Sequence, residues 1–196
     1  MSYDQIRQEA SEFLAQYHEE GSIPTPIEEI VEFDFEMATI PIEGLSDHLG
    51  VDAFLSNDLT AVFVDQYVME FVEVRYRFSL AHELGHHWLH DELYQSAKIA
   101  SVRDFKEVQE AIGDNYRWFE FHANSFAGLV LVPPETLKAR FTRRVEDAKA
   151  GGVPSASIPK HPVRQAFIEG LAREFNVSEQ AMTIRLEKDG LLPPLV

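Results

Sequence analysis

The sequence predicts an α+β fold, in which a small, mainly antiparallel sheet lies beside a helical region. Two observations predict it. Residues 31–64 contain apolar side chains that alternate with a period of two, whereas the later segments repeat apolar side chains at helical spacing. The 196 residues are 45% apolar and 26% charged, a composition typical of a globular protein with one domain and a small appendage.

Two helices are expected before the first strand. Residues 2–20 carry apolar side chains at helical spacing, and Gly21 is placed to end that helix. Thr25 is a suitable N-cap, with Pro26 at the first position of a short second helix. The chain therefore enters its sheet from a helical N-terminal segment.

The strands are predicted from alternation. Residues 31–37 alternate Val, Phe, Phe and Met with acidic residues, which favours a strand with one buried face. Residues 51–55 and 61–64 flank a polar segment and are expected to pair as a β-hairpin. These three segments make up the predicted sheet.

The rest of the chain is predicted to be helical. Five segments are predicted to be helices, namely residues 70–89, 115–132, 135–148, 163–175 and 178–188. Proline, serine or glycine marks an end of several of the later ones, such as Pro133, Pro134 and Ser178. Residues 151–159 are rich in glycine, proline and serine, which is typical of a linker. We therefore expect a main domain at 1–150, with residues 151–196 forming the linker and a C-terminal helical pair.

The charge balance and the cysteine count limit the function classes. Lys and Arg number 17 against 33 Asp and Glu, a net charge of -16 that disfavours direct binding to nucleic acid or anionic membranes. The chain has no cysteine, which excludes disulfides and thiolate ligands and fits a reducing compartment. No apolar run approaches the roughly 18 residues of a membrane span. A cytoplasmic protein is expected.

Residues 82–86 contain the pattern H-E-x-x-H. On a helix, side chains four residues apart project from the same face, so His82 and His86 can bind one metal ion. Neutral imidazoles suit zinc, and Glu83 lies round the helix where it can act as a general base on water. The alternative is a solvated, histidine-rich helix face. The apolar neighbours of the motif favour burial and therefore the metal site.

The helix predicted at 115–132 offers a third ligand. Glu120 is a carboxylate among aromatic residues, where an unpaired charge is costly. Asn124, one turn later, is placed to orient a ligand. Two alternatives remain: His122 is a rival ligand that cannot share a face with Glu120, and Glu120 can instead face solvent or pair with Arg117.

Hydrolysis of a peptide bond also needs a donor to the developing oxyanion. The sequence offers Tyr76, Tyr116, Arg77 and His122 and does not choose among them. His90, one turn beyond His86, is more suited to lining the cleft or to hydrogen bonding near Glu120 than to binding the metal.

Residues 75–90 resemble the signature R-x-R-F-[ST]-L-A-H-E-L-G-H-x-x-L-H of the ImmA/IrrE family of metallo-endopeptidases, and residues 120–133 are similar to its second signature, E-x-x-A-N-x-F-A-x-x-L-L-x-P. The resemblance implies a zincin-like site with His82, His86 and Glu120 as zinc ligands and Glu83 as the base, manganese being an alternative ion. His122 stands where many members have glutamate or glutamine.

The resemblance also implies a substrate. Members of this family resemble regulatory peptidases that inactivate a helix-turn-helix repressor of the XRE type, in phages, mobile elements or stress responses, and an acidic enzyme would suit a basic DNA-binding partner. The alternative is a metal-binding regulator that sequesters a transcription factor, or forms a toxin–antitoxin-type complex, without turnover. The charges of the C-terminal helical pair nearly cancel, which favours packing over DNA contact.

Overall fold

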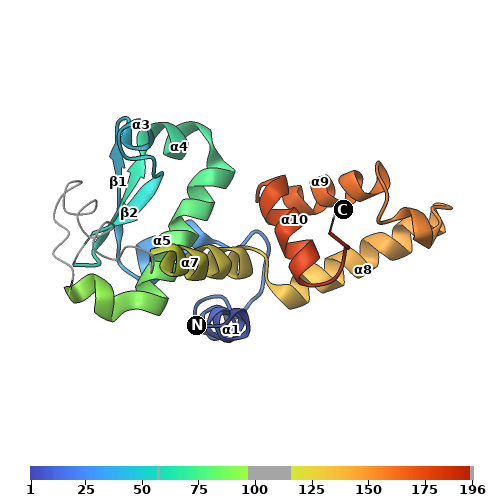
Figure 1. Cartoon of the computed structure of the whole chain (residues 1–196), viewed down its shortest axis with the longest axis horizontal. Helices are drawn as coiled ribbons and strands as arrows, with labels where there is room; N and C mark the ends of the chain where they lie inside the picture. The colour runs from blue at the N-terminus through green and yellow to red at the C-terminus, as the bar shows by residue number, and fades with distance from the viewer. Residues whose placement is uncertain (57, 97–115, 195–196) are drawn as a thin grey trace.

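A computed structural model describes residues 1–56, 58–96 and 116–194 of the chain. It confirms the α+β prediction, because helices surround one small sheet in this part of the chain (Figure 1). None of the described helices combines the length and apolar character that a membrane crossing requires.

The sheet has the strand order β1-β3-β2, formed by β1 (Ala38–Ile42), β2 (Ala53–Leu55) and β3 (Ala61–Asp65). The predicted hairpin is confirmed, because β2 pairs antiparallel with β3. β1 pairs with β3 in parallel, with Ala38 opposite Ala61, so the sheet is mixed rather than wholly antiparallel. The short helix α3 (Leu45–Leu49) lies in the connection that a parallel pair requires.

The strand predicted at residues 31–37 is wrong. Residues 31–34 are helical instead, because α2 (Ile27–Glu29) runs into a π-helix, η1 (Ile30–Asp34), and residues 35–37 belong to neither a helix nor a strand. Ile27, Ile30 and Val31 are buried on one side, while Phe33 is 69% exposed. A helical spacing of three and four residues therefore decides burial here, and the alternation with acidic residues does not.

Helix α1 (Tyr3–Tyr17) begins at a capping box, in which the Ser2 and Gln5 side chains each accept a hydrogen bond from the other residue's backbone N–H. Its apolar face packs on α7 (Tyr116–Leu131). There the ring of Phe13 meets that of Phe126 edge to face at 5.3 Å. The predicted N-terminal helix is confirmed, and it supports the back of α7.

The centre of the molecule is the pair α5 (Glu73–Ser96) and α7, which Figure 1 shows between the sheet and the C-terminal helices. A preceding helix, α4 (Gln66–Phe71), is capped by Asp65, whose carboxylate accepts a hydrogen bond from the backbone N–H of Val68. Many of the buried side chains of α5 and α7 belong to one hydrophobic core, including Leu80, Leu84, Ala127 and Leu129. This core fixes the positions of the two helices that carry His82, His86 and Glu120.

The C-terminal part contains α8 (Pro134–Ala150), the 3₁₀ turn η3 (Ser155–Ser157), α9 (Val163–Phe175) and α10 (Glu179–Lys188), close to the predicted helices. Pro134 opens α8, as expected. α9 packs on α8 and α10, and α10 also reaches α7. The predicted boundary at residue 150, between a main domain and a C-terminal appendage, stays a prediction.

Candidate metal centre

Two histidines of α5 face the same point. His82 and His86 lie one helical turn apart, and their Nε2 atoms are 3.0 Å from each other. α5 holds this spacing because it is continuous through the motif, with Ala81 and Leu84 fully buried on either side.

Glu120 reaches the same point from α7. Its carboxylate oxygens lie 3.5 Å from Nε2 of His82 and 3.3 Å from Nε2 of His86. A close approach of the two helices makes this possible: a Cβ at Gly85 would lie 3.1 Å from Cα of Ala123. Among the described residues, these three side chains form the one group able to hold a metal ion.

Hydrogen bonds at the far ring atoms orient both imidazoles. Nδ1 of His82 donates to Oδ1 of Asn124 at 3.2 Å, and Nδ1 of His86 lies 3.2 Å from Nδ1 of His90. Nε2 of His90 in turn lies 3.2 Å from Nδ1 of His122. If the Nδ1 atoms of His82 and His86 are the donors in these hydrogen bonds, the Nε2 atoms that face each other both carry lone pairs.

The donor set fits a divalent cation. Two lone pairs 3.0 Å apart and a carboxylate repel one another unless a positive charge lies between them. Ligand atoms bound tetrahedrally to zinc at about 2.0–2.1 Å lie roughly 3.3 Å apart. The three observed separations, 3.0, 3.3 and 3.5 Å, lie close to that value. Nitrogen and oxygen donors in this ratio are those of a catalytic zinc site with an open position.

The electrostatics agree with this interpretation. Burial, reinforced by His86, lowers the pKa of His82 to about 4, so the ring is neutral at pH 7. Burial acts to raise the pKa of Glu120, but a proton shared with Nε2 of His86 and the charge of the nearby imidazoles outweigh it and lower that pKa to about 2. A cation bound between the three side chains would take the place of that proton and leave both Nε2 lone pairs as ligands. Neutral imidazoles with an ionised carboxylate are the states that bind a metal ion.

Glu83 lies beside this group and is 5% exposed. Burial raises the pKa of its carboxyl to about 7, with His86 opposing and Glu120 reinforcing the effect. The carboxyl accepts a hydrogen bond from the backbone of Leu55 in β2, which holds it toward the sheet. A carboxyl with this pKa can take up and release a proton near neutral pH.

These residues line a cavity of about 220 Å³ between α5 and the segment before β2. Of the four candidate oxyanion donors, Tyr116 alone lines it, and it also hydrogen-bonds to Glu120. Tyr76 instead hydrogen-bonds to Thr39.

The other two candidate donors have structural roles. Arg77 is buried and pairs with Glu28 at 2.6 Å, while also donating to the carbonyl oxygen of Thr25. His122 hydrogen-bonds to His90 and does not reach the three converging side chains, so it is not the third ligand. The contact is made where α5 breaks at His90, whose φ is -135° and ψ is 21°. Helical spacing alone does not predict that contact.

Comparison with known proteins identifies the chain's family. No curated protein matches the chain. A family model, the IrrE N-terminal-like domain of Peptidase M78, matches residues 71–187, which include α5, α7 and the C-terminal helices. That match covers more than half of the sequence and agrees with the resemblance to ImmA/IrrE proteins. The chain belongs to the Peptidase M78 (IrrE N-terminal-like) family.

Proposed function

We propose that this protein is a zinc-dependent endopeptidase, with His82, His86 and Glu120 as the zinc ligands and Glu83 as the base. Membership of a metallopeptidase family supports the reaction class. The observation that carries the proposal is the convergence of three ligand atoms from two helices within 4.8 Å of one another, beside a buried carboxyl.

The residues of the chain divide the chemistry between them. His82, His86 and Glu120 would hold a zinc ion, which would serve as the Lewis acid for the attacking water and the scissile carbonyl. Glu83 takes one proton from the attacking water onto its carboxylate and then transfers it to the nitrogen of the leaving amine. Tyr116 lines the same cavity, and its hydroxyl hydrogen would have to turn from Glu120 to donate to the oxyanion.

The proposed substrate is a helix-turn-helix repressor of the XRE type. The resemblance to ImmA/IrrE proteins suggests it, and the net charge of -16 favours association with a basic DNA-binding domain. We propose that the enzyme does not bind nucleic acid itself. Arg164 and Arg185 of the C-terminal helices support this, because both are buried in ion pairs and not offered to phosphates.

Co-incubation with a purified helix-turn-helix repressor of the XRE type tests the proposal. We expect zinc-loaded protein to cut the repressor at one bond, and Glu83→Gln or a chelator to abolish the cut. Glu146→Gln, an exposed change on α8, is the matched control and should cut normally. Binding of the repressor without cleavage by any form would support the sequestering alternative and overturn the peptidase.

A further inference from the structure

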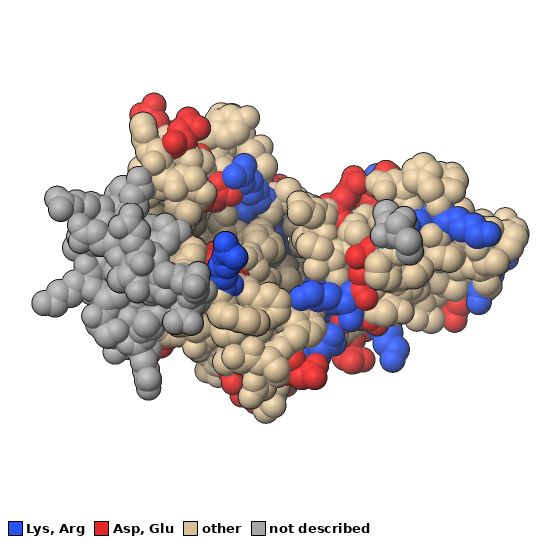
Figure 2. Space-filling view, viewed as in Figure 1, with Lys and Arg blue, Asp and Glu red and all other residues tan. Residues whose placement is uncertain are grey.

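A second, larger hollow lies next to the metal cavity. This groove of about 760 Å³ is bounded by the start of α5, by α7 and by α10, and we name it the α10 groove. Figure 2 shows the surface hollowed between the part that carries the sheet and the part that carries α9 and α10. Its apolar and charged lining includes Val74, Phe78, Phe121, Ala181, Ile184 and Lys188.

The groove adjoins the metal cavity. Phe78 and Asp52 line both spaces. Asn124 lines the groove and hydrogen-bonds to His82, so the groove begins at the side chain that orients a proposed zinc ligand. A polypeptide with its scissile bond at the metal site would therefore have the groove as the neighbouring surface on one side of that bond.

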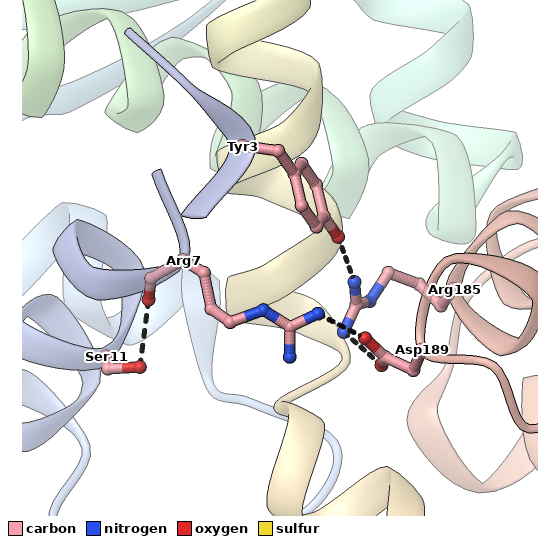
Figure 3. A network of polar contacts seen from close by, with 5 residues as sticks. All are labelled: Tyr3, Arg7, Ser11, Arg185 and Asp189. Carbon is pink, nitrogen blue, oxygen red and sulfur yellow. Dashed lines mark hydrogen bonds and ion pairs between the residues drawn. The ribbon is translucent and has the colours of Figure 1, made fainter. Parts of the chain in front are cut away.

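The far wall of the groove is held in place by a polar network that joins α1 to α10 (Figure 3). Arg185 donates to the hydroxyl of Tyr3 at 2.5 Å and pairs with Asp189 at 2.6 Å, and Arg7 of α1 pairs with the same carboxylate. Arg185 and Asp189 are largely buried. Tyr3 and Arg185 both line the groove, so its wall is preorganised for a ligand.

The lining indicates what the groove binds. Ile184 is 46% exposed there, an apolar side chain left open to solvent. Lys188 places its ammonium 4.1 Å from the ring centre of Tyr3 and 5.0 Å from that of Phe121. Within the described part of the chain, no acidic side chain forms an ion pair with Lys188. The groove thus offers an apolar surface with one unneutralised cation at its edge.

We propose that the α10 groove binds the substrate polypeptide beside the scissile bond, accepting an apolar side chain against Ile184 and Phe121 and an acidic side chain at Lys188. The inference rests on the proposed peptidase function and names the substrate sequence that this site selects. It makes the C-terminal helical pair part of the recognition site.

Capture of short synthetic peptides of randomised sequence tests the groove separately from catalysis. The zinc-loaded Glu83→Gln protein is immobilised, and the retained peptides are sequenced. We expect enrichment of Leu, Ile, Met or Phe, together with Asp or Glu a short distance away. Ile184→Asp should lower retention about tenfold, the loss of one good apolar contact. Lys188→Glu should exchange the acidic preference for a basic one.

Thr183→Asp is the matched control, because it adds the same charge to α10 outside the groove lining and should leave retention unchanged. Thermal melting of each variant checks folding. Retention without apolar enrichment, equal retention by Ile184→Asp, or no retention at all would overturn the groove proposal. Enriched retention without cleavage of those peptides by the wild-type enzyme would instead overturn the peptidase and leave the groove standing.

Discussion

Gly85 tests whether close packing of α5 on α7 creates the metal site. A Cβ at this residue would lie 3.1 Å from Cα and 3.2 Å from the carbonyl oxygen of Ala123, and 3.2 Å from a ring carbon of Phe126. Two of these contacts are with backbone, which cannot rotate away. Gly85→Ala should therefore push α7 back by a few tenths of an ångström.

The displacement reaches the metal site because Glu120 lies less than one turn before Ala123 on the same helix. Zinc–oxygen bonds tolerate little stretch, so we expect zinc affinity to fall on the order of 10–100-fold, as for other changes around metal ligands. Overpacking costs about 1–3 kcal/mol, whereas alanine gains about 1 kcal/mol of helix propensity over glycine. The unfolding free energy of the zinc-free protein should thus fall by about 0–2 kcal/mol.

Competition with a chromophoric chelator measures the affinity, and urea unfolding measures the stability. Gly128→Ala is the control, because a Cβ there contacts only the side chain of Arg185, at 3.4 Å. It should keep the zinc affinity of the wild type. Unchanged affinity in Gly85→Ala would refute the argument that the approach of α7 at this glycine sets the position of Glu120.

Three further predictions concern His90, Asp65 and the removal of zinc. His90→Ala removes the partner of His86 Nδ1 and should weaken zinc binding about 10–100-fold in the chelator competition; equal affinity would contradict the orienting role. Asp65→Ala removes the cap of α4 and should cost about 1 kcal/mol in urea unfolding at pH 7. Backbone hydrogen bonding, chiefly from Ser46, lowers the pKa of Asp65 in the folded protein. The Asp65 carboxylate therefore stabilises the fold fully above the unfolded-state pKa of about 3.9, and this stabilisation is lost as the pH falls below that value. A gap between Asp65→Ala and wild type that widens in acid would contradict this. Removal of zinc by a chelator should lower the melting temperature, since zinc at 100 times its Kd stabilises the folded protein by about 2.7 kcal/mol. The melting temperature of a variant that lacks both His82 and His86 should not change on chelation.

The helices that carry the site are predictable from the sequence because their burial follows helical spacing over long segments. α7 and α8 meet at the two prolines expected to separate them, Pro133 and Pro134. The H-E-x-x-H spacing also predicts which side chains converge, since the helix itself fixes that geometry.

The N-terminal strands are less predictable. Residues 31–37 alternate in polarity, which is typical of a strand. The segment that begins at Ile27 is nevertheless helical as far as Asp34, because a helix buries Ile27, Ile30 and Val31 together. β1 is not predicted from the sequence, since it contains Pro41 and proline is unfavourable in a central strand. In the structure β1 lies at the edge of the sheet, where proline is tolerated.

The contacts around the metal site also exceed what spacing can predict. His90 contacts His122 at a position where α5 departs from helical geometry, which helical spacing does not predict. The α10 groove depends on how the last helix docks on α1 and α7. The contacts that hold it, Tyr3 with Arg185 and Arg7 with Asp189, each join residues 182 positions apart in sequence. Such long-range contacts leave no local pattern in the sequence.

A crystal structure of the zinc-loaded protein, with anomalous diffraction recorded at the zinc absorption edge, tests the central claim most directly. We predict one anomalous peak in the cavity, about 2.0–2.2 Å from Nε2 of His82, Nε2 of His86 and a carboxylate oxygen of Glu120. A peak bound elsewhere, or a Glu120 side chain turned away from a zinc held by the two histidines alone, would contradict the account.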